Sequence, residues 1–198
     1  MGFMDEGPAF LETPNLDRMA AQGAHFRNAF VTTSLCSPSR ATILTGQYMH
    51  HHHVVDNQRP VAEGTRFFPE YLQESGYTTG FVGKWHMGHD NDEPRKGFNH
   101  WVSFKGQGTY FNPELNINGS RKAFKGYTTD ILADQALEWL QTRTDEDPFL
   151  LYLSFKAVHY PFQPAPRHHG RYDDKAIDYP MTMANTESNY QTKSNWIR

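Results

Sequence analysis

The sequence predicts an α/β fold in which a mostly parallel sheet is sandwiched between helices. Segments with helical spacing alternate along the chain with short segments rich in aromatic and β-branched residues. One of these short segments, residues 149–153, is almost continuously apolar, and residues 77–82 predict a second buried strand. Such strands are typical of parallel sheets that are covered on both faces. Hydrophobic residues make up 37% of the 198 residues, which is enough for one sizeable core.

Caps and breakers mark the first elements. Thr13 and the proline that follows it are typical of a helix N-cap and first turn, and Gly23 ends this helix. Residues 26–31 are aromatic and β-branched, and they predict a strand. A second helix is expected to begin just after Cys36, because a proline lies in its first turn and Gly46 follows its last apolar residues.

The later elements have clearer periodicity. Residues 68–74 predict a helix closed by Gly76, and residues 77–82 predict a strand. Residues 128–143 predict the clearest helix, and a short acidic linker leads from it into the strand at 149–153. The apolar stripe of the clearest helix consists of Ile131, Leu132, Ala136, Leu137, Trp139 and Leu140.

The order of these elements places three polar side chains at one edge of the sheet. Lys84 and His86 follow the strand at 77–82, and His159 follows the strand at 149–153. In open α/β sheets, ligands bind outside the carboxyl ends of the strands. We therefore expect these side chains to project toward a shared site.

Composition excludes several classes of function. Acidic residues (22) outnumber the dispersed lysines and arginines (19), so the chain predicts no nucleic-acid partner. It has no apolar run of about 18 residues, so no membrane span is predicted. The single cysteine excludes an internal disulfide and a cysteine metal cage. Residues 118–120 fit a glycosylation acceptor, a pattern that is common by chance.

The strongest signal is the run of residues 35–46, which contains Cys36. A cysteine at a helix N-terminus feels the positive end of the helix dipole, and Arg40 adds a cation about one turn later. Such a position suits an anion and an activated nucleophile. A buried, inert cysteine is the structural alternative. A phosphatase-type cysteine loop is excluded, because it needs a longer spacing to the arginine and a glycine-rich cradle.

This run resembles the sulfatase signature, Cys-x-Pro-x-Arg followed by a short helix that ends in Thr-Gly. The resemblance implies an alkaline-phosphatase-like fold and the hydrolysis of sulfuric esters. It also implies that a maturation enzyme oxidises Cys36 to formylglycine, whose hydrated form attacks sulfur and later expels the bound sulfate. In this family pattern, Arg40 holds the loop of the nucleophile.

Residues 76–88 resemble the second sulfatase signature. By resemblance, Lys84 contacts both the sulfate and the formylglycine, and His86 hydrogen-bonds the hydrated formylglycine and assists sulfate release. Both roles make chemical sense, since an ammonium stabilises the charge of a sulfuryl transition state and a histidine accepts a proton near neutral pH. The alternative is a surface lysine beside a packed histidine at a strand end.

Residues 154–162 are similar to the family segment Ser-Phe-x-x-x-His-x-Pro-Phe. The resemblance implies that His159 touches the sulfate and protonates the leaving alcohol. Lys156 lies within the same segment and is a candidate second cation for binding the substrate. These two residues complete a predicted set of anion-binding side chains.

The four consecutive histidines at 50–53 invite a metal interpretation. Adjacent side chains diverge on any regular backbone, so a loop at the rim of the pocket is the favoured interpretation. By resemblance, such histidines followed by residues 54–57 occur in sulfatases that act on 6-sulfated N-acetylglucosamine, as does the stretch at 97–108. His53 and Asn57 are therefore predicted to contact a sugar substrate.

The resemblance also implies a divalent cation, usually Ca²⁺, with the formylglycine from Cys36 as a ligand. The family completes the cation cage with an Asp-Asp pair after the first strand and a later acidic pair, and neither stands in the right context here. Asp173 and Asp174 lie in a polar segment and are not assigned this role. Residues 1–198 are thus expected to be a partial catalytic domain that lacks its first strand and its C-terminal part.

The predicted function is the hydrolysis of a sulfated carbohydrate, with a formylglycine-generating enzyme as a further partner. The N-terminal residues show no signal peptide, whereas the resemblance implies a periplasmic, secreted or lysosomal protein. Two rivals stay open. One is a phosphonate or phosphodiester hydrolase of the same fold, and the other is an inactive remnant that binds sugar or metal.

Overall fold

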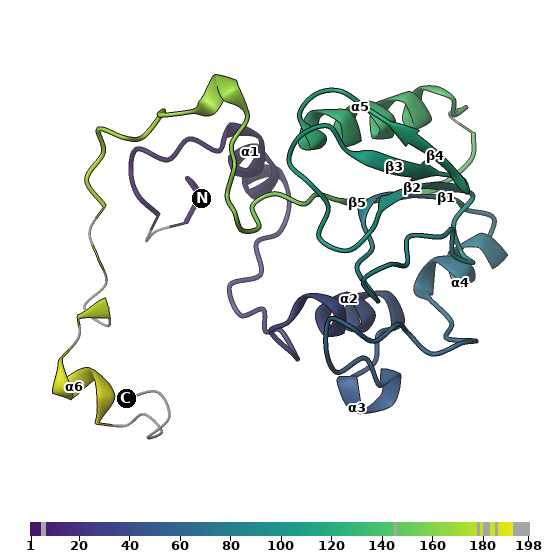
Figure 1. Cartoon of the computed structure of the whole chain (residues 1–198), viewed down its shortest axis with the longest axis horizontal. Helices are drawn as coiled ribbons and strands as arrows, with labels where there is room; N and C mark the ends of the chain where they lie inside the picture. Colours follow the sequence, from purple (N-terminus) through teal and green to yellow (C-terminus); the bar gives the residue numbers. More distant parts are fainter. Residues whose placement is uncertain (5–6, 145, 178, 180–182, 185, 192–198) are drawn as a thin grey trace. The chain divides into compact units, whose positions relative to one another are not determined.

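The computed structural model describes residues 1–4, 7–144, 146–177, 179, 183–184 and 186–191. These residues form two compact units (Figure 1). One unit comprises residues 30–165 and holds the sheet. The other comprises residues 1–29 together with the chain from residue 166 onward.

A five-stranded sheet with the strand order β4-β3-β2-β1-β5 is the centre of the larger unit. The strand β1 pairs in parallel with both β2 and β5, whereas β2–β3 and β3–β4 are antiparallel pairs. The predicted α/β class is confirmed, with a parallel centre and an antiparallel hairpin at one edge. The strands are β1 (Thr78–Lys84), β2 (His100–Phe104), β3 (Glu114–Ile117), β4 (Ser120–Ala123) and β5 (Phe149–Ser154).

Helices cover both faces of this sheet, as Figure 1 shows. The helices α2 and α4 lie on one face, and α5 lies on the other face. The short α3 stands between α2 and α4 in the sequence. The predicted helices after Cys36, at 68–74 and from 128 onward are confirmed, the last one ending two residues early. The helices are α2 (Cys36–Thr45), α3 (Met49–His52), α4 (Phe68–Glu74) and α5 (Thr128–Gln141).

The two faces of the sheet are packed by alternate residues of the parallel strands. On the face toward α2 and α4, the ring of Phe81 stacks between Trp101 and Tyr152, with ring centroids 4.5 and 5.5 Å away. On the opposite face, Val82 and Val102 belong to the cluster that includes residues of α5. This close packing fixes the carboxyl ends of β1 and β5 relative to α2.

Glycine lets α5 approach the sheet closely. A Cβ atom on Gly80 of β1 would lie only 3.0 Å from the indole ring of Trp139 of α5. Gly83, near the end of the same strand, has φ +125°, and a Cβ there would collide with the carbonyl of Ser154. The β1–β5 pair therefore depends on glycine just before the strand reaches Lys84.

The predicted strand at 26–31 is wrong. These residues form no strand, and the side chains of Phe26 and Phe30 are 79% and 89% exposed. Aromatic and β-branched residues favour extended backbone, but a strand also needs a neighbour to pair with. No pairing of these residues is present in the described part of the chain.

The hairpin of β3 and β4 and the strand β2 were not among the predicted elements. Asn118 and Gly119 form the two-residue turn of the hairpin, with φ of 50° and 92°. An Asn-Gly pair with positive φ at both positions is a strong hairpin signal, here overshadowed by its match to a glycosylation acceptor. The hairpin is tied to the loop before β2 by an ion pair in which Arg121 contacts the buried Asp92 at 2.5 Å.

The strand β5 is apolar, as predicted, but it is an edge strand and is not buried on both faces. Phe149 is 49% exposed, and Leu153 is exposed as well. A continuous apolar run predicts a strand covered by helices and flanked by two others. Among the described residues, β5 pairs with β1 alone.

The smaller unit contains the helix α1 (Pro14–Gln22), which begins and ends as predicted. The rings of Phe10 and Tyr172 lie 5.4 Å apart, and Arg171 forms an ion pair with Glu12, so residues before α1 contact residues after 166. A 3-10 turn (Pro166–His168) and the short helix α6 (Glu187–Tyr190) complete this unit. None of the helices in the described ranges is long and apolar enough to cross a membrane.

Candidate active site

Cys36 is the first residue of α2, and the start of this helix is held by two tertiary contacts. The backbone N–H of Ser37 donates to Oδ1 of Asn57 at 3.0 Å, and the Ser37 hydroxyl donates to the carbonyl of His86. Gly46 closes the helix in the left-handed region with φ 69°. The partly exposed Cys36 thiol is therefore placed at a rigid helix N-terminus, as the sequence predicted.

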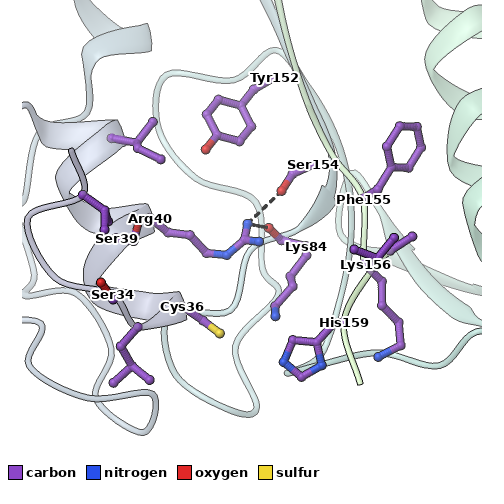
Figure 2. Close-up of a pocket in the computed structure, with 15 residues that line it drawn as sticks. Ser34, Cys36, Ser39, Arg40, Lys84, Tyr152, Ser154, Phe155, Lys156 and His159 are labelled. Carbon is purple, nitrogen blue, oxygen red and sulfur yellow. Dashed lines mark hydrogen bonds between the residues drawn. The ribbon is translucent and has the colours of Figure 1, made fainter. Parts of the chain in front are cut away.

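Arg40 links α2 to the ends of two parallel strands (Figure 2). Its guanidinium donates to the carbonyl of Lys84 at 2.5 Å and to Oγ of Ser154 at 2.7 Å. Burial lowers the pKa of Arg40, but an arginine stays charged in proteins. This side chain thus fixes the nucleophile helix to β1 and β5 and leaves a positive charge beside Cys36.

Lys84 is the last residue of β1 and is only 3% exposed. Its Nζ donates to Oε1 of Gln107 at 2.5 Å. Burial is the main reason that the pKa of Lys84 falls to about 8, and the neighbouring charge of Arg40 lowers it further. The ammonium therefore remains largely protonated at neutral pH.

The loop after β5 contributes Lys156 and His159. Lys156 is buried, and its Nζ lies 4.7 Å from the centroid of the Tyr110 ring, whose hydroxyl donates to the carbonyl of His159. Burial lowers the pKa of Lys156. Nδ1 of His159 lies 2.8 Å from the carbonyl of Tyr160, which can only accept, so this nitrogen carries the proton.

These side chains surround one cavity of about 630 Å³. Figure 2 shows the Cys36 sulfur, the Lys84 ammonium and the His159 ring pointing toward the same space. None of the lining residues in the described part of the chain is acidic, so the cavity is suited to an anion. The lining comprises Val31, Ser34, Leu35, Cys36, Ser39, Arg40, Ile43, Lys84, Tyr152, Ser154, Phe155, Lys156, Ala157, Val158 and His159.

His86 does not line this cavity. Its side chain is fully buried, its φ is 48°, and neither ring nitrogen has a hydrogen-bond partner among the described residues. Burial, followed by the charges of Lys84 and Arg40, lowers the pKa of His86 to about 4. The imidazole is therefore neutral at pH 7, and its two buried nitrogens are not satisfied by any side chain or backbone group in the described part of the chain.

The two predicted sugar contacts lie outside the cavity lining. His53 is exposed in the left-handed position that ends α3, and its contact with a sugar stays a prediction. Asn57 is half-buried and uses its side-chain oxygen to accept from Ser37. In this structure Asn57 supports the nucleophile helix, a role that the sequence pattern did not reveal.

The side chains of the histidine run make separate contacts, and only the rings of His50 and His51 lie close together, with centroids 4.2 Å apart. Nδ1 of His52 accepts from the backbone N–H of Val54 at 3.1 Å, so its Nε2 carries a proton for Oγ1 of Thr42, also at 3.1 Å. The ring of His50 instead stacks on Tyr48. Within the described ranges, no group of three or more histidine, cysteine or acidic side chains could hold a metal ion.

The residues present do not fit the calcium site that the family resemblance implies. Ca²⁺ takes six to eight oxygen ligands, many of them carboxylates. The cavity beside Cys36 offers cations and no acidic side chain in the part of the chain that the structure describes.

Two contact residues, Gln107 and Tyr110, were not singled out by sequence reasoning. They belong to the loop after β2 and reach Lys84, Lys156 and His159 from a distant part of the chain. The glycines on both sides of Gln107 were a usable signal, because such a pattern marks a tight turn. The partners of that turn could not be deduced without the strand order.

Comparison with known proteins gives one consistent result. The family model described as Sulfatase matches residues 6–195. An N-acetylglucosamine-6-O-sulfatase from Bacteroides thetaiotaomicron is 37% identical over 180 residues, which cover 89% of this chain and 32% of that protein. The human N-acetylglucosamine-6-sulfatase is 31% identical, over 88% of this chain and 35% of that protein.

A solved structure described as a complex with its substrate D-glucosamine-2-N,6-O-disulfate is similar in fold. It superimposes with a TM-score of 0.81 at 38% sequence identity, over 87% of this chain and 35% of that chain. The chain thus spans about a third of the length of the relatives it matches.

Proposed function

Because the chain belongs to the sulfatase family, we propose that this protein hydrolyses sulfate esters of a carbohydrate through a formylglycine made from Cys36. The observation that carries the proposal is the cavity in which Cys36 meets four basic side chains and no acidic one among the described residues. The favoured substrate class is a 6-O-sulfated glucosamine, since the names of several relatives specify that sugar.

Lys84 and Lys156 bind and stabilise the sulfuryl group. A sulfate ester spreads additional negative charge over its oxygens as the S–O bond breaks, and fixed ammonium groups on buried lysines stabilise that charge. Arg40 is committed to the carbonyl of Lys84 and to Ser154, so its main role is to hold the nucleophile helix against the strand ends.

Two histidines handle protons. Formylglycine, once hydrated, supplies a hydroxyl nucleophile and a second hydroxyl whose deprotonation expels the sulfate. His159 lines the cavity and donates a proton to the oxygen of the leaving alcohol. His86 is neutral at pH 7 and its ring has no hydrogen-bond partner among the described residues, which suits a group that accepts a hydroxyl proton.

The test is an assay of the chain after co-expression with a formylglycine-generating enzyme. We expect turnover of 6-sulfated N-acetylglucosamine and of an aryl sulfate, and none by the Cys36→Ala variant. An aryl phosphonate ester is assayed in parallel to separate the phosphonate hydrolase of the same fold. A preference for the phosphonate, or equal activity in Cys36→Ala, would refute the proposal.

A binding measurement tests the alternative that the chain is an inactive remnant that binds sugar or metal. The cavity predicts that 6-sulfated N-acetylglucosamine binds more tightly than the unsulfated sugar, because only the former carries an anion for Lys84 and Lys156. Calorimetry with both sugars, on the wild type and on Lys156→Met, measures this difference. Equal affinities for the two sugars would remove the cavity as the sulfate site.

A further inference from the structure

The loop after β2 approaches the cavity as a tight turn. The N–H of Gly108 donates to the carbonyl of Lys105 at 3.1 Å, which places Gly106 and Gln107 at the centre of the turn. Both glycines have positive φ, and a Cβ on Gly108 would lie 2.5 Å from the ring of Phe104. The direction of the Gln107 side chain is therefore set by the turn, and the backbone on both sides of Gln107 adopts a conformation that favours glycine.

The far end of this loop is clamped to the start of α5. The Thr128 hydroxyl donates to the carbonyl of Thr109 at 2.7 Å, and the Thr128 N–H donates to the carbonyl of Tyr110 at 2.9 Å. Thr128 is itself buried. Gln107 thus stands on a turn held at both ends, and it does not line the cavity.

The amide oxygen of Gln107 accepts from the Lys84 ammonium at 2.5 Å. Such an acceptor fixes the direction of the ammonium and favours its protonated form, yet it carries no charge of its own. A carboxylate in the same place would form an ion pair and cancel the positive charge that an anion needs. The choice of glutamine agrees with a cavity whose described lining has no acidic side chain.

We infer that Gln107 is a positioning residue for Lys84, whose ammonium it holds in place without neutralising the cavity. The inference rests on the proposed function only for the sulfate that the held ammonium binds. The contact itself involves Lys84 and Gln107 alone. The turn at 105–108 therefore positions one cation for contact with a sulfuryl group.

The test compares Gln107→Glu and Gln107→Met with the wild type and with Gln135→Ala. Gln135 lies on α5 and bonds Glu138, away from the cavity lining, so it is a matched control. Two quantities are measured on each protein. They are the pKa of Lys84, from a side-chain NMR titration, and the affinity for inorganic sulfate, from calorimetry at pH 7.

We expect the two variants to shift the pKa of Lys84 in opposite directions from about 8. The carboxylate of Gln107→Glu raises it and weakens sulfate binding by about tenfold, since one positive charge is cancelled. Gln107→Met loses the hydrogen bond to the charged form and lowers the pKa. A purely structural role predicts no such opposition, and Gln135→Ala should match the wild type.

The inference is overturned if the pKa of Lys84 is the same in wild type, Gln107→Glu and Gln107→Met while sulfate still binds. In that case the proposed function stands and only the positioning role fails. Opposite pKa shifts without sulfate binding in the wild type would instead support the positioning role and count against the proposed function.

Discussion

Individual side chains create the charge of the cavity, because each ammonium or guanidinium there is held by a neutral acceptor or a ring. Arg40 donates to a carbonyl and a hydroxyl, Lys84 donates to an amide, and Lys156 lies over the Tyr110 ring. Exposed ion pairs contribute little to stability, but buried cations without counter-ions are available for an anionic ligand. Substitutions at two single residues, Lys84 and His86, test this arrangement.

The first concerns the contribution of Lys84 to turnover. Lys84→Ala in the formylglycine-containing enzyme should lower kcat by about 10²–10³, the usual cost of losing one donor that stabilises transition-state charge. Lys105→Ala is the control, since Lys105 is exposed and outside the cavity lining. Steady-state kinetics on an aryl sulfate measure both. Wild-type kcat in Lys84→Ala would exclude this lysine from the reaction.

The second concerns stability and pH through His86. The pKa of this histidine is about 4 in the folded protein and about 6.5 when unfolded, so the unfolded state binds more protons between these values. The free energy of unfolding should therefore rise from pH 4 to pH 6.5, by at most about 3 kcal/mol from this group.

Urea unfolding of wild type and His86→Gln at several pH values tests this dependence. The variant should show a shallower rise across that interval, whereas His25→Gln, at an exposed position, should follow the wild type. The same slope in all three proteins would mean that His86 is not held neutral by the fold.

Much of this site was predictable from motifs, and the remainder depended on distant contacts. Cys36 begins α2, Lys84 ends β1 and His159 lies in the loop after β5, so their convergence follows from the order of elements. Gln107 and Asn57 act through a backbone or side chain far away in the sequence, and no local pattern identifies such partners. The role of His53 is still a prediction.

At the scale of elements, the position of the nucleophile depends on the first turn of α2. The free N–H groups of a helix start need acceptors, and Asn57 supplies one to Ser37. The segment after α3 is thereby coupled to the helix that carries Cys36. Asn57, which is predicted to contact sugar, has a structural contact in this protein, and the two roles lead to different results on substitution.

Asn57→Ala should lower the free energy of unfolding by about 1–2 kcal/mol, because it leaves a helix N–H without its acceptor. Gln58→Ala, at the neighbouring exposed position, should change it by less than about 0.5 kcal/mol. Chemical denaturation measures both values. Unchanged stability in Asn57→Ala together with weaker sugar binding would favour the sugar-contact role.

Helices were predicted more accurately than strands, for a physical reason. A helix satisfies its hydrogen bonds locally, so nearby residues are enough to place its ends. Thr13 and Pro14 marked the start of α1, and Gly46 marked the end of α2. A strand needs a neighbour, which explains the wrong strand at 26–31 and the missing β2. The Asn-Gly turn of β3–β4 was a local signal that the glycosylation pattern obscured.

At the scale of the whole molecule, the net charge of the chain and the charge of the cavity have opposite signs. The chain has a formal charge of −3, yet the described cavity lining is exclusively basic where it is charged. The α/β class followed from the alternation of elements, because apolar strands that alternate with helices can bury their faces in few other arrangements. The antiparallel edge and the exposed β5 did not follow, since sheet order is decided by contacts between distant segments.

The chemical identity of residue 36 after maturation tests the whole account most directly. The chain is co-expressed with a formylglycine-generating enzyme, and the mass of the peptide that contains Cys36 is measured. We predict a peptide about 18 Da lighter than the thiol form, as expected when a CH₂SH group becomes an aldehyde. An intact thiol, under conditions in which a control peptide is converted, would contradict the account.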